Sequence, residues 1–162
     1  MKFRIEQSEL KNLVTIAEKA ISTRSNLPAL EGLYLKAVDK KVSVTGTDLT
    51  IGINTFTESV EIEEEGEVVI VAKVFSDLIK KLPSGQMLTI NSDEQNNITF
   101  TCLMSEFTLK GLSAEKYPDL PKIEEHKSFE LDKDKFTNMV NHVLYATSKD
   151  EVRLELTGAL LN

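Results

Sequence analysis

Apolar residues recur at intervals of three and four in three segments of the chain, which is the spacing of an amphipathic helix. The first segment covers 8–22, and Ser8 is a plausible N-cap for it. A second helix is predicted over 73–81, where a Pro-Ser-Gly sequence stops it, and a third over 133–149. The first helix places these apolar residues on one face: Leu10, Leu13, Val14, Ala17, Ala20 and Ile21.

Elsewhere apolar and polar residues alternate, as they do in strands with one buried face. Asp39-Lys40 predicts a hairpin turn between two such segments, and 93–97 predicts another. The segment 117–121, Tyr-Pro-Asp-Leu-Pro, cannot continue a central strand and is interpreted as a linker. Strands mixed with helices indicate an α+β fold. The predicted strands cover 3–6, 33–38, 41–47, 50–62, 67–71, 87–91, 97–102 and 106–112.

The start of the chain reappears 126 residues later, so that strand, helix and following strand recur without a net insertion. A weaker match appears at a shift of 65 residues. Chance agreement between amphipathic helices would explain the weaker match, because all such helices share one period. At the longer shift the aligned pairs include Phe3 with Phe129, Leu10 with Phe136, Val14 with Val140, Leu30 with Leu156 and Gly32 with Gly158. At the shorter shift they are Ile5 with Ile70, Leu10 with Phe75, Leu13 with Leu78 and Val14 with Ile79.

One strand-helix-strand half cannot bury its apolar faces alone. Two halves related by an approximate two-fold axis can pack their helices side by side on antiparallel sheets. We therefore expect residues 1–121 to form one complete domain of two halves, 122–126 to be a linker, and 127–162 to begin a second domain. Because 127–162 holds only the first part of a repeat, we expect the chain to be the leading part of a longer protein.

The charge of the 162-residue chain is unevenly distributed. Its net charge of −7 by itself argues against a nucleic-acid partner. The three helical segments, taken as 8–24, 73–81 and 133–149, nevertheless contain nine Lys/Arg and four Asp/Glu, a net charge of +5 that leaves −12 for the remainder. Basic helices on an acidic body would present one positive surface to a polyanion. The alternative is that lysines and glutamates are scattered over solvated faces.

The residues give no indication of catalysis, and we expect no enzyme activity, cofactor or metal. His126 and His142 lie apart from any cluster with ligand spacing, and no phosphate-binding loop or nucleophile motif is present. Successive residues of the Glu61–Glu65 run point to opposite faces of a strand, so the run is interpreted as a solvated strand end. Cys102, the single cysteine, lies in an alternating segment and is predicted to be buried, which fits a reducing cytosol. No apolar run approaches the ~20 residues of a membrane span.

Seven short motifs follow one another along the chain. They are Met1-Lys2-Phe3, Arg24-Ser25-Asn26-Leu27-Pro28, Gly46-Thr47-Asp48-Leu49, Ala72-Lys73-Val74-Phe75 with Leu82-Pro83-Ser84-Gly85, Tyr117-Pro118-Asp119-Leu120, Ala146-Thr147-Ser148-Lys149-Asp150 with Val152-Arg153, and Leu156-Thr157-Gly158. In this order and at this spacing they resemble the bacterial DNA polymerase III beta subunit family, the beta sliding clamps, over essentially the whole chain.

The resemblance implies a DNA-clamp fold with three domains per chain, of which this sequence covers the first and the beginning of the second. It further implies that two chains close head to tail into a ring, with helices lining the hole and sheets on the outside. The implied function is that of a non-catalytic processivity factor, which encircles duplex DNA and tethers the replicative polymerase. The implied partners are duplex DNA, the DNA polymerase III catalytic subunit, the clamp loader and a second copy of the full-length chain, all in the cytoplasm.

The resemblance also implies DNA-contacting positions. Arg24 and Lys73 match places where family members contact DNA with a basic residue. The loop after the third helix departs from the family, because Asp150 stands where an uncharged polar residue is common and Leu154 where an aromatic side chain can occur. The stronger candidates in that loop are therefore Lys149 and Arg153, and each of these cations could instead be an ordinary solvated charge.

Two further sets of positions are implied. Leu156 matches one wall of the family's hydrophobic pocket for partner peptides, although it could equally be a core residue. Phe107 and Leu109, on a strand expected at the domain edge, match positions of the ring's subunit interface, where strand pairing would extend a sheet between chains. An enzyme is the main alternative class, and a protein-interaction module that keeps the α+β fold without binding DNA is the second.

Overall fold

The computed structural model describes residues 1–21, 27–120, 129–150 and 152–161. The chain divides into two compact units, Met1–Pro121 and Lys122–Asn162. The linker predicted at 122–126 lies outside the described residues. No helix in the described part of the chain is long and apolar enough to cross a membrane.

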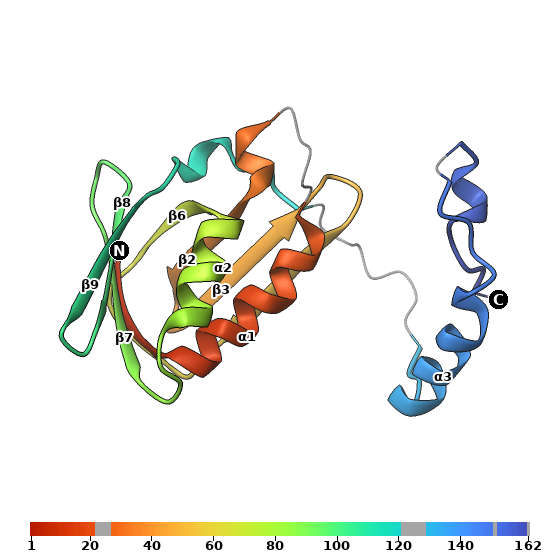
Figure 1. Cartoon of the computed structure of the whole chain (residues 1–162), viewed down its shortest axis with the longest axis horizontal. Coiled ribbons are helices and arrows are strands. Elements are labelled where there is room, and N and C mark those ends of the chain that lie inside the picture. Colours follow the sequence, from red (N-terminus) through yellow and green to blue (C-terminus); the bar gives the residue numbers. More distant parts are fainter. Residues whose placement is uncertain (22–26, 121–128, 151, 162) are drawn as a thin grey trace. The chain divides into compact units, whose positions relative to one another are not determined.

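The first unit consists of two antiparallel sheets with two helices packed against them (Figure 1). One sheet has the strand order β5-β1-β7-β8-β9 and the other β4-β3-β2-β6. The elements of its first half are β1 (Lys2–Glu6), α1 (Gln7–Ala17), the 3₁₀ turns η1 (Glu18–Ala20) and η2 (Pro28–Glu31), β2 (Gly32–Val38), β3 (Lys41–Thr47) and β4 (Gly52–Thr57). After β5 (Val60–Glu64), the second half contains β6 (Gly66–Val71), α2 (Ala72–Lys81), β7 (Met87–Ser92), β8 (Asn97–Cys102), β9 (Ser105–Lys110) and the turn η3 (Ala114–Lys116).

The two halves of this unit have the same topology, a strand followed by a helix and three antiparallel strands. The leading strand of each half pairs with the other half: β1 lies against β7, and β6 lies against β2. α1 begins at Gln7 and α2 at Ala72, which is a shift of 65 residues. The weaker repeat in the sequence is therefore real, and the predicted α+β fold with a pseudo-two-fold repeat is confirmed.

The core lies between the helices and the sheets. Phe3, Phe75 and Phe100 are completely buried, and the rings of Phe75 and Phe100 lie 5.6 Å apart. Full burial of each such side chain stabilises the fold by roughly 1.5–3 kcal/mol. Cys102 is buried in the same cluster, as predicted. At Gly46, β3 comes so close to the end of α1 that a Cβ atom would lie 2.2 Å from the carbonyl oxygen of Ala17.

The hairpin predicted at Asp39-Lys40 is confirmed. These residues have φ angles of 51° and 62°, and two successive positive φ values are the signature of the two-residue turn that matches strand twist. The turn at 93–97 is also present, where the Asp93 carboxylate accepts hydrogen bonds from the backbone N–H groups of Gln95 and Asn97. A hydrogen bond from the Asn97 side-chain amide, together with these two backbone bonds, lowers the pKa of Asp93.

Three local predictions for the first unit were wrong. The first helix is α-helical only to Ala17 and ends as a 3₁₀ turn at Ala20. Ser8 is not its N-cap, because the helix is preceded by Glu6 and the Ser8 hydroxyl donates to the Glu6 carboxylate. The strand predicted over 50–62 is two strands, β4 and β5, which belong to different sheets. A turn closed by the Val60 N–H donating to the Glu58 carbonyl separates them.

The second unit contains α3 (Lys133–Leu144) and the 3₁₀ turn η4 (Leu154–Leu156). They begin 126 residues after α1 and η2, at the positions that the longer repeat predicts. Asp132 caps α3 by accepting a hydrogen bond from the Lys135 N–H at 2.9 Å. The prediction that this helix extends to 149 was wrong, and the described residues 129–132 and 157–161 form no strand. A strand needs neighbouring strands for its backbone hydrogen bonds, and the described part of this unit offers none.

The segment that leaves the first unit is held against the outer surface of the second sheet. The Tyr117 hydroxyl donates to the Thr45 carbonyl at 3.1 Å, and the Tyr117 ring stacks on Tyr34 with centroids 5.2 Å apart. Leu120 lies over Gly52 of β4, where any Cβ would collide with it. Residues Tyr117 and Leu120, in the segment 117–121 that was interpreted as a linker, are therefore packed on the first unit.

Alkaline pH should loosen this anchor. Burial raises the pKa of Tyr117 from 10.0 to about 12. The folded state thus favours the neutral phenol, so its stabilisation is fully present below pH 10 and is lost as the pH rises toward 12. We expect the free energy of unfolding, measured by denaturant titration at stepped pH, to fall across this interval. In Tyr117→Phe the fall should be smaller, and the stability at neutral pH should be lower by about 1 kcal/mol. An identical alkaline fall in the variant would contradict this account.

The close approach at Gly46 predicts a second effect on stability. Gly46→Ala should lower the free energy of unfolding by about 1–3 kcal/mol, because the new methyl group meets backbone atoms of α1 that cannot rotate away. Gly158→Ala is the matched control, since a Cβ at Gly158 has no atom within 4 Å. Thermal and denaturant melts of both variants test the prediction, and equal stabilities would refute it.

Candidate nucleic-acid interface

The helices α1 and α2 lie side by side on the same side of the first unit (Figure 1). Each turns an apolar stripe toward the sheets, with Leu10 and Val14 on α1 and Phe75 and Ile79 on α2. The opposite stripe of each helix faces solvent. The charged residues of α1, η1 and α2 that can contribute to this solvent side are five lysines and three carboxylates.

Four of these lysines form no ion pair within the described residues. We call them the helix-face lysines: Lys11, Lys19, Lys73 and Lys81. The fifth, Lys80, is bonded to Glu18 at 3.0 Å and links α2 to the end of α1. The charge of a lysine that forms no ion pair is not neutralised within the protein. This side of the unit is therefore suited to phosphate contacts.

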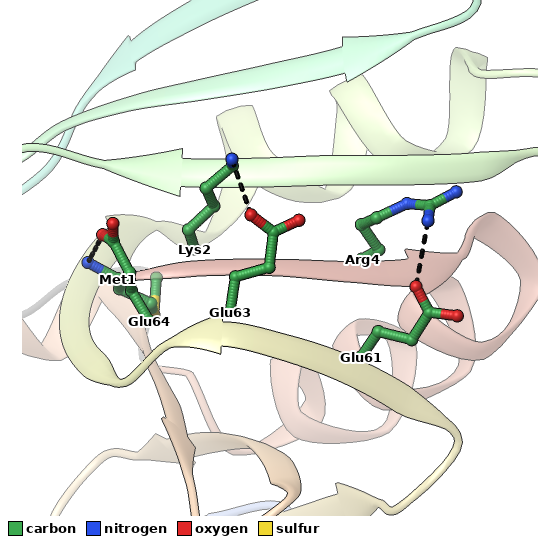
Figure 2. A network of polar contacts seen from close by, with 6 residues as sticks. All are labelled: Met1, Lys2, Arg4, Glu61, Glu63 and Glu64. Atoms are coloured by element: carbon green, nitrogen blue, oxygen red, sulfur yellow. Dashed lines mark hydrogen bonds and ion pairs between the residues drawn. The ribbon is translucent and has the colours of Figure 1, made fainter.

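The cations on the sheets are arranged differently, as Figure 2 shows for β1 and β5. Lys2 is bonded to Glu63 at 2.6 Å and Arg4 to Glu61 at 3.0 Å, and the Met1 amino group lies 4.0 Å from Glu64. The hydrogen bond to Glu63 raises the pKa of Lys2. The Glu61–Glu65 run is thus a solvated strand whose carboxylates are largely paired with neighbouring cations.

The same holds on the other sheet. Lys36 is paired with Glu67 at 3.4 Å and Lys41 with Glu58 at 2.9 Å. Such exposed pairs contribute about 0–1 kcal/mol each, so their main effect is to cancel charge locally. Lys40 in the hairpin forms no ion pair within the described part of the chain, and Lys110 donates to Gln95 and Asn97.

Lys73 occupies an electrostatically unfavourable place. It lies in the first turn of α2, where the helix dipole favours negative charge, and the first turn contains no acidic residue. Its side chain is exposed and has no ion-pair partner among the described residues. Lys73 therefore gains stability neither from the helix dipole nor from an ion pair with a described residue.

The described part of the chain holds no group of three or more His, Cys, Asp or Glu residues that could bind a metal ion. Cys102 is buried and His142 is exposed near the end of α3. Arg24 and His126 lie outside the described residues, so the structure says nothing of the DNA contact predicted for Arg24.

The first unit matches a known protein family. The family model for the DNA polymerase III beta subunit, N-terminal domain, matches residues 1–121. The chain belongs to the DNA polymerase III beta subunit family.

Relatives and solved structures extend the likeness to the whole chain. The chain is 39% identical over 168 residues to the beta sliding clamp of Bacillus subtilis (strain 168), an alignment that covers 98% of the chain and 43% of the relative. It is 34% identical to that of Halalkalibacterium halodurans, with the same coverage. The crystal structure of the DNA polymerase sliding clamp from Bacillus subtilis matches at a TM-score of 0.88 and 36% identity, covering 95% of this chain and 42% of that one. A putative DNA polymerase III beta subunit from Eubacterium rectale gives a TM-score of 0.92 at 25% identity, covering 98% and 43%.

This beta-subunit chain therefore spans less than half the length of the relatives it matches. The predicted clamp fold is confirmed by these structural neighbours.

The second unit contains the remaining DNA-contact candidates on one closed loop. The Ser148 N–H donates to the Leu156 carbonyl at 2.8 Å and closes the loop. Lys149 and Arg153 are exposed on it, whereas the Asp150 carboxylate accepts the Val152 N–H at 3.0 Å and so stabilises the turn. The loop also includes Leu154, in η4, and Leu156, which is exposed in this unit.

The edge positions lie where the sequence placed them. β9 is the outermost strand of its sheet, with Phe107 exposed and Leu109 half-buried. Sequence reasoning singled out Lys73 but not Lys11, Lys19 or Lys81. Helical periodicity predicts that these three lysines face solvent. The sequence does not show that they lack ion-pair partners.

Lys73→Glu should separate a functional from a structural role. We expect the 162-residue chain to bind duplex DNA weakly at low salt, and the variant to bind less with a salt slope smaller by about one. Its free energy of unfolding should stay level or rise by about 0.3–1 kcal/mol, because a carboxylate suits the helix N-terminus. Fluorescence anisotropy and denaturant melts measure the two effects. Lys40→Glu is the matched control, and an equal loss of binding there would point to net charge alone.

Proposed function

We propose that the protein to which this chain belongs is a non-catalytic processivity factor. As a ring it would encircle duplex DNA and tether a replicative DNA polymerase. The relatives named beta sliding clamp support this proposal. The observation that carries it is the separation of unpaired lysines on the helices from paired cations on the sheets.

The physical task of such a ring is topological. A closed ring converts dissociation into motion along DNA, so its contacts need only be weak and independent of sequence. Each phosphate that a cation neutralises adds about 0.9 to the salt slope of binding, and many such contacts would act as a brake. The four unpaired helix-face lysines, and the lack of an exposed aromatic platform on the described α1, η1 and α2, suit contact with the DNA backbone. The tethered polymerase gains effective concentration.

Residues 1–121 form the first clamp domain in this proposal, 122–126 the linker, and 127–162 the start of the second domain. Lys73 and Arg24 would contact DNA from the first domain. Lys149 and Arg153 would contact it from the second. Asp150 and Leu154 would contribute less, and the Asp150 carboxylate already accepts a hydrogen bond within its own loop.

β9 would form the ring's subunit interface. An edge strand presents unpaired backbone N–H and C=O groups, and a strand from a second copy of the full-length chain would complete them. Phe107, with 39% of its side chain exposed, and Leu109 would pack across that boundary. Leu156, 54% exposed in this unit, would form one wall of a pocket for peptides of the DNA polymerase III catalytic subunit and the clamp loader. With these partners the protein would act in the cytoplasm.

Retention on circular DNA tests the proposal. The full-length protein, loaded on a nicked circle by a clamp loader, should remain bound in high salt and be released when the circle is linearised. Alanine replacement of the helix-face lysines should slow loading but leave retention on circles unchanged, because topology needs no charge. Equal loss from circular and linear DNA, measured by gel filtration, would sink the proposal.

A further inference from the structure

A pocket of about 420 Å³ opens on the first unit, apart from the helix-face lysines. It lies where three segments meet: the beginning of η2, the turn after β3, and the segment that follows β9. Its volume is within the ~300–1,000 Å³ of typical ligand sites. Seven apolar residues line most of it: Leu27, Pro28, Ala29, Leu30, Leu49, Leu112 and Pro118.

One wall of the pocket is held in place at a conformational cost. Leu49 has a φ of 74°, which is the left-handed region that a leucine rarely adopts, and its side chain is 64% exposed. The Thr47 hydroxyl accepts the Leu49 N–H at 3.0 Å and donates to the Ile51 carbonyl at 2.8 Å. The Asp48 carboxylate accepts the N–H groups of Thr50 and Ile51. This turn fixes Leu49 before any partner arrives.

The opposite walls are equally fixed. Leu112 exchanges two backbone hydrogen bonds with Val69 of β6, at 2.8 and 3.1 Å. Leu30 is 3% exposed and therefore cannot move aside. A pocket whose walls do not have to be ordered on binding loses little entropy when a ligand enters.

The lining contains almost no polar group that could orient a small molecule. Ser113 is the polar lining residue, and its hydroxyl already accepts the Glu115 N–H. Small-molecule sites usually add several convergent polar groups to an apolar wall. Apolar side chains of a peptide are a better fit to this pocket.

The sequence neighbours of the lining residues are acidic. Glu31 follows Leu30, Asp48 precedes Leu49, and Asp119 follows Pro118. Glu31 and Asp119 are exposed and form no ion pair with any cation of the described residues. The backbone hydrogen bonds from Ile51 and Thr50 lower the pKa of Asp48, which keeps that carboxylate ionised. Three carboxylates thus lie within one residue of the pocket lining, and none of them forms an ion pair with a cation of the described residues.

We propose that this pocket docks a short peptide segment of a partner protein, with two or three adjacent apolar side chains flanked by basic residues. The apolar side chains enter between Leu30, Leu49 and Leu112, and the basic side chains pair with Glu31 and Asp119. This charge preference is opposite to that of the helix-face lysines. The proposal goes beyond DNA encirclement and does not depend on it, because the pocket lies wholly within the first unit.

Peptide titration of the 162-residue chain tests the proposal. The probe is a fluorescein-labelled peptide of sequence Arg-Leu-Leu-Phe-Arg, followed by fluorescence polarisation. We expect saturable binding, at least about tenfold weaker binding of Glu-Leu-Leu-Phe-Glu, and no saturable binding of Arg-Ala-Ala-Ala-Arg. Methyl NMR signals of Leu30 and Leu112 should shift on addition of the probe. Absence of saturation, or equal binding of the alanine peptide, would overturn the proposal.

Two variants locate the site. Leu49→Asn removes the apolar wall but suits a positive φ, so the fold should survive while binding weakens at least about fivefold. Leu103→Asn is the matched control, since Leu103 is likewise an exposed leucine with a positive φ, in the turn between β8 and β9. Asp119→Asn should weaken the arginine-flanked peptide alone. Unchanged binding in Leu49→Asn, or an equal loss in Leu103→Asn, would refute the assignment.

Discussion

The first unit depends on an exchange of leading strands between its two halves. β1 opens the first half yet pairs with β7, and β6 opens the second half yet pairs with β2. Neither half can therefore complete its sheet alone, and forming both sheets brings α1 and α2 onto one side. The buried residues of both helices then share a core with Phe3 and Phe100, which joins the halves into one cooperative unit.

The electrostatics of the unit follow from this arrangement. The cross-strand register sets Arg4 opposite Glu61 and Lys36 opposite Glu67, so sheet cations meet carboxylates at hydrogen-bonding distance. The helices have no such cross-strand partners, and four of the five lysines on α1, η1 and α2 form no ion pair with a described residue. A chain with a net charge of −7 can thus present a locally positive surface, because what a phosphate senses within the ~10 Å Debye length is the uncompensated charge nearby.

The second unit shows how much local sequence can do by itself. Helical period and the Asp132 cap are sufficient to place α3. The turn η4 begins at Leu154, which is 126 residues after Pro28, the first residue of η2. The apolar side chains of α3, such as Phe136 and Met139, remain exposed within this unit. Strands at both ends of the repeat are missing from its described residues, since their formation requires partners distant in sequence.

The sequence by itself determined the repeat, the class of fold, most element positions and the hairpin at Asp39-Lys40, because these rest on period and on turn chemistry within a few residues. Motif order also indicated the family. Tertiary structure alone decided that 50–62 splits between two sheets, that Lys73 is unpaired while Lys2 is not, and that Leu49 walls a pocket. Each of these outcomes depends on which distant strands become neighbours and in what register, and a periodic pattern carries no information about that pairing.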